Sequence, residues 1–302
     1  MTAKAGQTPV DELVRIRDWL RYAVTSMNRA GLVYGHGTTN AVDEAAYLIL
    51  ATLDLPIEDI NPWLDCRLTL AEREAVNAVI SKRIETRKPA AYITNAAYIQ
   101  GHKFYVDERV IVPRSFIGEL LVQDHLGTIV PAPLAVRRVL DLCTGSGCLA
   151  ILAALAFPNA EIDASDISDD ALAVARRNIA DYGLETRIRT FKADLFEGLP
   201  PAAYDLIISN PPYVTAEAVA AFPPEYQAEP TLAHIGGVDG MDLVRRILDG
   251  APSRLSPEGS LVVEIGMGQE ALEASRPDLP FLWLDSETSE GEVFALHAVD
   301  LK

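Results

Sequence analysis

The stretch Tyr-Asp-Leu-Ile-Ile-Ser-Asn-Pro-Pro-Tyr at residues 204–213 is the part of the sequence around which the rest is organised. Its first six residues are mostly apolar and partly β-branched, which is typical of a buried parallel strand. Pro211 and Pro212 have no amide hydrogen to donate to a neighbouring strand, so the strand must end before them. The Asn-Pro-Pro-Tyr turn is therefore predicted at the carboxyl end of a strand, the edge of an open α/β sheet where ligands bind.

The side chains of this turn suit the binding of a planar NH₂ group. Asn210 offers a neutral side-chain carbonyl, and the backbone carbonyls beside Pro211 and Pro212 can accept hydrogen bonds because the strand ladder is broken there. Tyr213 supplies an aromatic face on which a planar group can stack. A neutral acceptor holds the nitrogen without first removing its proton, which suits attack by that nitrogen on an electrophilic carbon. Taken alone, the four residues are equally compatible with a turn that only ends the strand.

The amino-acid composition limits the classes of protein to which the chain can belong. With 302 residues, 49% of them hydrophobic, the chain can form one large domain or two unequal ones. It has no apolar run long enough for a membrane helix and no signal sequence, so a cytoplasmic protein without membrane contact is expected. The three cysteines lack CxxC or zinc-finger spacing, and neither disulfides nor a metal site are expected.

The formal net charge of −17 bears on partners. Direct binding to nucleic acid requires clustered Lys and Arg, so it is not expected. A basic protein is the better partner, although the same acidity also serves plain solubility. The sequence indicates no particular oligomeric state.

The first part of the chain has the pattern of a small helical domain. Helical periodicity predicts helices over residues 10–30, 41–53 and 70–87, with Thr69 as N-cap of the last. Residues 91–112 lose this period and carry β-branched and aromatic side chains around Gly101, which predicts a β-hairpin. The predicted division is therefore a helical domain over 1–90, a hairpin linker over 91–112 and an α/β domain over 113–302.

From residue 137 onward short strands alternate with helices, which predicts a doubly wound, mostly parallel sheet. The two final strands are adjacent and predict an antiparallel edge pair. Strands are predicted over residues 138–142, 160–165, 187–192, 204–209, 260–265, 281–284 and 291–298, and helices over residues 116–126, 148–156, 168–182, 240–254 and 268–275. Ser115 and Ser168 are the predicted N-caps of the first and third of these helices. Arg114 can reach the ligand-binding edge or be an ordinary surface arginine.

The ends of the first strands suit a nucleoside. The turn over residues 143–147 contains glycines that let a ligand approach backbone amides at a helix N-terminus, although such a turn also fits a dinucleotide site or a plain tight turn. Asp166, at the end of the second strand, can accept hydrogen bonds from both ribose hydroxyls or merely lead into the next helix. Asp194 can accept from an exocyclic amine while Leu195 covers a base.

The glycine turn also favours one kind of nucleoside. Cys148 and Leu149 follow the turn where a pyrophosphate-binding helix would need a third glycine. A nucleoside without phosphates therefore fits better than a dinucleotide. S-adenosylmethionine, which combines ribose, adenine and a methyl sulfonium, is the cofactor that this pattern favours.

The combined motifs resemble those of class I S-adenosylmethionine-dependent methyltransferases. From about residue 17 to its end, the chain is similar to the protein glutamine methyltransferases of the HemK/PrmB type, and within them to the PrmB branch. Cys143 and Cys148 stand where the release-factor branch usually has glycine and alanine. The matching stretches are residues 35–38, 104–109, 112–115 and 141–150, Asp166, Asp194, residues 210–213, Glu225-Tyr226 and Glu229-Pro230. The chain departs from the pattern at Phe116 and at residues 97–99 and 234–236.

The resemblance implies a Rossmann-like, seven-stranded, mostly parallel sheet preceded by a substrate-recognition domain. It implies methyl transfer to the side-chain amide nitrogen of a glutamine in the third large-subunit ribosomal protein, a basic substrate taken before assembly. The implied catalytic residues are Asn210, Pro211, Pro212 and Tyr213, and Arg114 is implied to bind substrate with Asn210 and Tyr213. The implied cofactor-binding residues are Asp141, Cys143, Thr144, Gly145, Ser146, Gly147, Asp166, Asp194, Leu195 and Asn210.

Three other functions stay open on the sequence. Glutamine methylation of peptide release factors would use the same catalytic parts. Adenine N-methylation in DNA uses a similar Asn-Pro-Pro-Tyr turn, but the charge of −17 makes the chain a poor DNA binder. A non-catalytic ribosome-assembly factor would hold a basic ribosomal protein without turnover.

Overall fold

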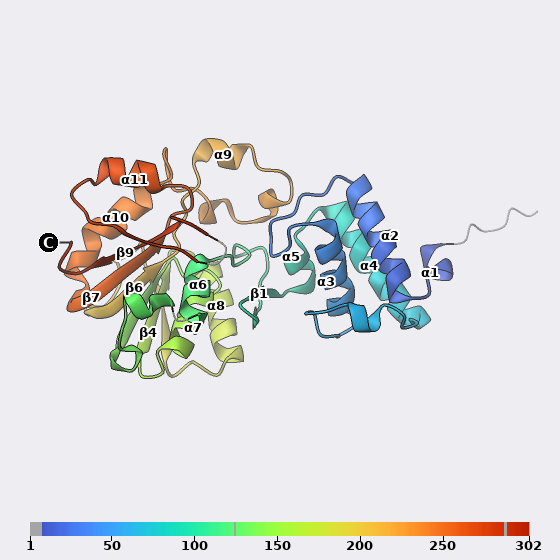
Figure 1. Cartoon of the computed structure of the whole chain (residues 1–302), viewed down its shortest axis with the longest axis horizontal. Helices are drawn as coiled ribbons and strands as arrows, with labels where there is room; N and C mark the ends of the chain where they lie inside the picture. Colours follow the sequence, from blue (N-terminus) through green and yellow to red (C-terminus); the bar gives the residue numbers. More distant parts are fainter. Residues whose placement is uncertain (1–7, 124, 287–288, 302) are drawn as a thin grey trace, which may run out of the picture. The chain divides into compact units, whose positions relative to one another are not determined.

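The structure is a computed structural model that describes residues 8–123, 125–286 and 289–301 (Figure 1). The chain divides into two compact units: Met1–Ala96 with Pro223–Ala228, and Ala97–Phe222 with Glu229–Lys302. The short segment 223–228 thus belongs to the same unit as the N-terminal helices. Within the described ranges, no helix is both long and apolar enough to cross a membrane.

The first unit is helical, as its apolar periodicity predicts. Its core includes Trp19, Met27, Leu48 and Ile80, all almost completely buried. Its elements are α1 (Pro9–Glu12), α2 (Ile16–Arg29), α3 (Ala41–Thr52), α4 (Leu70–Thr86) and α5 (Ala90–Thr94), with 3-10 turns η1 (Asn61–Trp63) and, in the inserted segment, η4 (Tyr226–Ala228).

Two local predictions in this unit need correction. The single helix predicted over 10–30 is two helices, because Asp18 turns back to accept the backbone amides of Val14 and Arg15 at 3.2 and 2.9 Å and caps a new start. Residues 90–94 form α5, so the hairpin begins later than the loss of helical period at 91 indicates. The cap at Thr69 is confirmed, since its hydroxyl accepts from the Glu72 amide and Glu72 accepts from the Thr69 amide.

Segment 223–228 is held in the helical unit by a buried charge. The Glu225 side chain is fully buried, accepts a hydrogen bond from the Val33 amide at 3.1 Å and forms an ion pair with Arg87 at 2.7 Å. The neighbouring Arg83 is equally buried and pairs with Glu44 at 2.7 Å. Breaking a buried pair leaves an uncompensated charge, so these contacts fix the segment firmly.

The second unit contains a seven-stranded sheet in the order β5-β4-β3-β6-β7-β9-β8. The strands β5, β4, β3, β6 and β7 are parallel neighbours, and β9 runs antiparallel to both β7 and β8. The predicted fold class, including the antiparallel edge pair, is confirmed. The strands are β3 (Arg138–Leu142), β4 (Glu161–Asp166), β5 (Ile188–Lys192), β6 (Tyr204–Ser209), β7 (Leu255–Glu264), β8 (Leu282–Leu284) and β9 (Val293–His297), and the separate hairpin pairs β1 (Ala97–Ile99) with β2 (His102–Phe104).

Helices cover both faces of this sheet (Figure 1). Successive strand residues point to opposite faces, so Val139 joins the core under α6, α7 and α8, whereas Leu140 joins the core under α10 and α11. The helices are α6 (Phe116–Val122), α7 (Cys148–Ala156), α8 (Asp169–Asp181), α9 (Ala216–Ala220), α10 (Asp242–Gly250) and α11 (Gln269–Ser275), and the 3-10 turns are η2 (His125–Thr128), η3 (Pro133–Ala135), η5 (Thr231–Ala233) and η6 (Ala251–Ser253).

The element boundaries differ from prediction mainly near prolines and helix ends. The helix predicted over 240–254 ends at Gly250 because Pro252 lies in the following 3-10 turn and cannot donate an α-helical hydrogen bond. The helix predicted over 116–126 ends at Val122, and residue 124 of that range lies outside the described residues. Strand β7 begins at Leu255, earlier than predicted, through a register shift against β6.

Candidate active site

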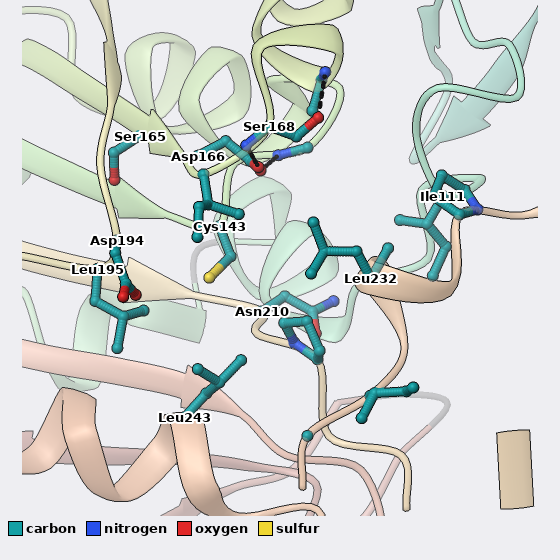
Figure 2. Close-up of a pocket in the computed structure, with 18 of the residues that line it drawn as sticks. Ile111, Cys143, Ser165, Asp166, Ser168, Asp194, Leu195, Asn210, Leu232 and Leu243 are labelled. Carbon is teal, nitrogen blue, oxygen red and sulfur yellow. Dashed lines mark hydrogen bonds between the residues drawn. The ribbon is translucent and has the colours of Figure 1, made fainter. Parts of the chain in front are cut away.

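A cavity of about 390 Å³ lies at the carboxyl ends of the central strands of the second unit (Figure 2). Strand β3 pairs with β4 on one side and β6 on the other, so the sheet order reverses here, as it does at the ligand sites of open α/β sheets. The predicted site residues that line the cavity are Cys143, Gly145, Asp166, Asp194, Leu195, Asn210 and Pro212.

The turn after β3 requires a special backbone. Cys143, Gly145 and Gly147 all have positive φ angles, of 58°, 55° and 79°. A Cβ atom at Gly147 would lie only 3.1 Å from the Cβ of Ala175 in α8, so glycine permits the close approach of the turn to that helix. Gly147 therefore shapes the turn by packing and is not among the described residues that line the cavity.

Asp141 stabilises this turn from beneath. Its carboxylate is completely buried and accepts hydrogen bonds from the Thr144 hydroxyl at 2.5 Å and the Ala150 amide at 3.0 Å. Burial raises the pKa of Asp141 to about 7, although both hydrogen bonds oppose the shift. Asp141, Thr144 and Ser146 are buried rather than exposed to the cavity in the described part of the chain.

Cys143 contributes an apolar wall. Its side chain lines the cavity between Asp166 and Asn210 (Figure 2). Burial, followed by the nearby charges of Asp166 and Asp141, raises the pKa of the Cys143 thiol well above its ordinary value. The thiol is therefore neutral at physiological pH and is not poised as a nucleophile.

Asp166 ends β4 with its carboxylate at the cavity. It accepts the backbone amides of Gly145 at 3.0 Å and Ser168 at 2.9 Å, two of the contacts drawn in Figure 2. Burial raises the pKa of Asp166, and these amides oppose the shift. Ser168 itself caps α8 by accepting from the Ala171 amide, so Asp166 is not needed as a cap. A carboxylate has about four lone-pair sites, which leaves acceptors for a ligand.

Asp194 and Leu195 follow β5 at the same cavity. Oδ1 of Asp194 pairs with Arg246 of α10 at 2.9 Å, and Arg246 lines the cavity as well. Leu195 is buried and has a positive φ of 52°, which turns its side chain at the strand end. The two residues thus place an acceptor beside an apolar surface.

The Asn-Pro-Pro-Tyr turn follows β6, as predicted. Nδ2 of Asn210 donates hydrogen bonds to the carbonyl of Arg114 at 3.2 Å and to Oε1 of Glu264 at 3.1 Å. Because both amide hydrogens are engaged, the polar function that Asn210 can offer a ligand is its carbonyl oxygen. Pro212 lines the cavity, whereas Pro211 and Tyr213 are not among the described lining residues.

Tyr213 packs beside the end of β7. A Cβ atom at Gly266 would lie 2.7 Å from its ring, so the ring rests directly on that glycine. Burial, followed by the charge of Glu264, raises the pKa of the Tyr213 phenol strongly, which keeps it protonated. The ring is therefore a neutral aromatic surface within the Asn-Pro-Pro-Tyr turn.

The long segment after Tyr213, predicted to flank the substrate, supports the turn. The Val214 amide donates to the His234 carbonyl at 2.8 Å, and the Gly236 amide donates to the Val214 carbonyl at 2.9 Å. Cβ atoms at Gly236 and Gly240 would clash with backbone oxygens of the turn. The same segment adds Leu232 and Ile235 to the cavity wall, which no sequence motif predicted.

Arg114 does not direct its guanidinium into the cavity. Its Nη2 pairs with Oε2 of Glu229 at 2.9 Å, and the buried Glu229 also accepts from the Val112 amide and lies 3.2 Å from Nε2 of His234. Its backbone carbonyl, by contrast, accepts the hydrogen bond from Asn210. The link to the predicted catalytic residue is made by the main chain.

Glu264 is the residue that sequence reasoning missed. It lies almost fully buried at the end of β7, where Oε2 accepts from the Ser115 hydroxyl at 2.7 Å and the Phe116 amide at 2.9 Å. Ser115 is thus not the side-chain cap that was predicted; Glu264 caps α6 in its place. A signal was present, because Glu264 follows the apolar residues 261–263 much as Asp166 ends its own strand.

The donor set fits a nucleoside that carries positive charge and no phosphate. The Gly145 amide, which a phosphate would need, already donates to a carboxylate. The Asp166 carboxylate disfavours an anion beside it, whereas the charge of Asp194 is already paired with Arg246. No cluster of potential metal ligands occurs in the described ranges. Fold and cavity together define a class I S-adenosylmethionine-dependent methyltransferase.

Comparisons agree with this class and narrow it. Residues 119–222 match the methyltransferase small domain family. The chain is 53% identical over 305 residues to the ribosomal protein uL3 glutamine methyltransferase of Bradyrhizobium diazoefficiens, covering 99% of this chain and 94% of the relative. It is 55% identical over 285 residues to that of Neisseria gonorrhoeae, covering 94% and 95%. The chain belongs to the ribosomal protein uL3 glutamine methyltransferase family.

A solved structure adds support for the fold alone. The catalytic domain of hMettl16 in complex with MAT2A 3'UTR hairpin 1 aligns with a TM-score of 0.51 and 16% identity, covering 84% of this chain and 90% of that one. Together with the family membership that the curated relatives show, the cavity described above makes the protein an enzyme that uses S-adenosyl-L-methionine as methyl donor.

Proposed function

We propose that this enzyme methylates the side-chain amide nitrogen of a glutamine in ribosomal protein uL3. Its relatives at 53–55% identity carry that activity in their names. The observation that carries the proposal is Asn210, whose amide hydrogens both bind the protein, so that a neutral acceptor remains at a nucleoside-type cavity. Such an acceptor matches an NH₂ group.

Different residues of the cavity would bind different parts of the cofactor. Asp166 would accept from the ribose hydroxyls, and Asp194 with Leu195 would hold the base. Gly145 permits close backbone approach, and the neutral Cys143 thiol lines the space without competing as a nucleophile. When bound, S-adenosylmethionine supplies an electrophilic methyl carbon.

The catalytic turn would orient a weak nucleophile. The lone pair of a glutamine amide is delocalised, as the roughly 18–20 kcal/mol rotation barrier of an amide indicates. The Asn210 side chain and the Pro211 carbonyl would each accept one amide hydrogen, and Tyr213 would pack on the amide plane. The fixed orientation of the substrate amide and the fixed carbonyl dipoles of the turn would accelerate methyl transfer. No residue has to remove a proton before transfer, because the nitrogen can release its proton after the methyl group has been transferred.

The same acceptors would exclude glutamate. A glutamate carboxylate has no hydrogens to give to the two carbonyl oxygens and would place like partial charges against each other. Leaving buried acceptors unsatisfied costs about 1–3 kcal/mol. Glutamine is therefore selected by the polarity of the turn rather than by its size.

The substrate is proposed to be free uL3, before it joins the ribosome in the cytoplasm. The charge of −17 favours a basic protein partner and disfavours a surface covered with RNA. We assign selection of the substrate to the helical domain predicted over residues 1–90. The hairpin linker over 91–112 and the methyltransferase domain over 113–302 follow it along the chain. Stronger labelling of assembled large subunits than of free uL3 would contradict the proposed timing.

The test is transfer of labelled methyl groups from S-adenosylmethionine to purified uL3, with peptide release factor in parallel. Label on uL3, mapped by mass spectrometry and lost when the mapped glutamine is replaced, is the expected result. Label only on release factor would replace the proposed substrate. Label on neither would contradict glutamine methylation of both.

A further inference from the structure

We propose that Glu264 is a positioning residue that decides which end of the Asn210 amide faces the substrate. The inference rests on the proposed glutamine methylation and deepens it. An asparagine amide has nearly the same shape in both orientations, so only its hydrogen-bond partners determine whether it presents oxygen or NH₂. Presenting oxygen selects an amide substrate, whereas presenting NH₂ would select a carboxylate.

The orientation of Glu264 is itself fixed by groups that cannot reverse. Its Oε2 accepts from the backbone amides of Phe116 and Ile117 at 2.9 and 3.4 Å and from the Ser115 hydroxyl at 2.7 Å. Backbone amides can only donate. These donors come from the start of α6, so that helix anchors the carboxylate at the end of β7.

The other oxygen of Glu264 acts on Asn210. Oε1 accepts from Nδ2 of Asn210 at 3.1 Å. In its ionised form, which predominates above a pKa of about 7, Glu264 has no hydrogen to donate. The carbonyl of Arg114, the second partner of Nδ2, is likewise an acceptor only. Both partners therefore require the NH₂ end of Asn210, which leaves its carbonyl oxygen as the group that it can offer at the cavity it lines.

A glutamine at position 264 separates this role from the capping of α6. In Glu264→Gln the side-chain oxygen must stay at the donors of α6, so the helix keeps its cap. The NH₂ group then faces Nδ2 of Asn210, a donor against a donor. The Asn210 amide then either reverses, so that its NH₂ group faces the substrate, or loses its hydrogen bond to residue 264. A reversed amide would present a donor to the NH₂ group of the substrate.

The experiment compares Glu264→Gln with the wild-type enzyme on uL3 and on uL3 whose mapped glutamine is changed to glutamate. We expect kcat on uL3 to fall about 10- to 100-fold, with the KM for S-adenosylmethionine unchanged. The Kd for each form of uL3 is measured in the presence of S-adenosylhomocysteine. The ratio of the Kd for the glutamate form to the Kd for the glutamine form should be at least about tenfold smaller in the variant than in the wild type. A merely structural role would not change this preference.

Two variants make the outcome interpretable. Asp163→Asn is the matched control: Asp163 is a buried carboxylate in β4 that bonds Arg138, Arg189 and Tyr204 and does not line the cavity, so wild-type kcat and preference are expected. Glu264→Asp remains an acceptor and should lower kcat while keeping the preference for glutamine. It also provides the test if Glu264→Gln does not fold, as judged by S-adenosylhomocysteine binding.

The possible results separate the two proposals. An active wild-type enzyme beside a Glu264→Gln variant with unchanged kcat and preference would overturn the role of Glu264 alone. Loss of the preference in Glu264→Asp would also overturn it, because an acceptor would then not suffice. A wild-type enzyme that neither methylates nor binds uL3 would overturn the proposed function and this inference with it.

Discussion

The carbonyl oxygen of Arg114 accepts a hydrogen bond from Nδ2 of Asn210 at 3.2 Å, while the guanidinium of the same arginine pairs with Glu229. The residue thus contacts the Asn-Pro-Pro-Tyr turn through its main chain. A side-chain substitution at Arg114 and one at Asn210 should consequently have different effects.

Asn210→Ala should reduce kcat by at least about 100-fold, because it removes an acceptor that is proposed to orient the substrate amide. Binding of S-adenosylhomocysteine, measured by calorimetry, should change little. Asn159→Ala is a suitable control, since Asn159 is a surface residue whose side chain donates to the Leu134 carbonyl and does not line the cavity. Near-normal turnover of Asn210→Ala would exclude the assigned role.

Arg114→Ala should leave the carbonyl contact with Asn210 in place but remove the ion pair between Arg114 and the buried Glu229. We expect a loss of about 1–3 kcal/mol in the free energy of unfolding, measured with urea, because a buried carboxylate then loses one of the groups that compensate its charge. The exposed pair Arg15–Asp65 gives the comparison, and Arg15→Ala should cost less than about 1 kcal/mol. Equal losses in the two variants would contradict this account.

Asp166→Ala should weaken binding of S-adenosylhomocysteine by about tenfold or more, since the proposed acceptor of the ribose hydroxyls is lost. The effect should appear in the Kd of the cofactor product and not in the affinity for uL3. Asn210→Ala is expected to show the reverse pattern. If Asp166→Ala bound the nucleoside as tightly as the wild type, the assignment of the ribose site would be wrong.

Gly147→Ala and Gly145→Ala separate backbone strain from steric clash. Both glycines have positive φ, but only at Gly147 would a Cβ meet a neighbour, Ala175, whereas at Gly145 it would meet nothing within 4 Å. Gly145→Ala should cost about 1 kcal/mol of unfolding free energy for the left-handed conformation, and Gly147→Ala about 1–3 kcal/mol more. Urea midpoints that rank the two variants in the opposite order would refute the packing argument.

Asp141 should give the protein a pH-dependent stability. Burial raises its pKa to about 7 in the folded state, against about 3.9 in an unfolded chain. The folded state then holds a proton that the unfolded chain has released, so the free energy of unfolding falls as the pH rises from about 4 to 7. Stability from this group is fully present at low pH and is lost as the pH passes the folded pKa.

Asp141→Asn should flatten this dependence by up to about 1.4 kcal/mol per pH unit. Glu264, whose pKa burial also raises to about 7, keeps its own contribution in the variant. Urea unfolding at pH 5, 6 and 7 measures the slope. A slope equal to that of the wild type would show that Asp141 does not titrate in this range.

The strand ends of the cavity could be predicted because their signals are local. The apolar run before Asn210 and the glycines after β3 fix where the chain turns, and the order of strands in an open sheet then brings Asp166, Asp194 and Asn210 to one edge. The fold class and the cofactor followed from these residues.

What the sequence did not reveal depends on partners distant along the chain. Glu264 bonds Asn210 and the start of α6, and its one local signal, a place at the end of a strand, does not reveal these two partners. Ser115 has the residue type of an N-cap, but the carboxylate of Glu264 takes that role. The pairing of Arg114 with Glu229 likewise joins residues that are far apart in sequence.

Segment 223–228 has a consequence for how this enzyme can be divided and recombined. Since the helical unit includes Pro223–Ala228, the chain passes between the two units three times, and no single cut separates them. A fragment ending at Ala96 would lack Glu225 and leave Arg87 without that buried counter-charge. A chimera that exchanges helical units between relatives must therefore exchange two separate segments of the gene, those that encode Met1–Ala96 and Pro223–Ala228. Both segments must come from the same relative.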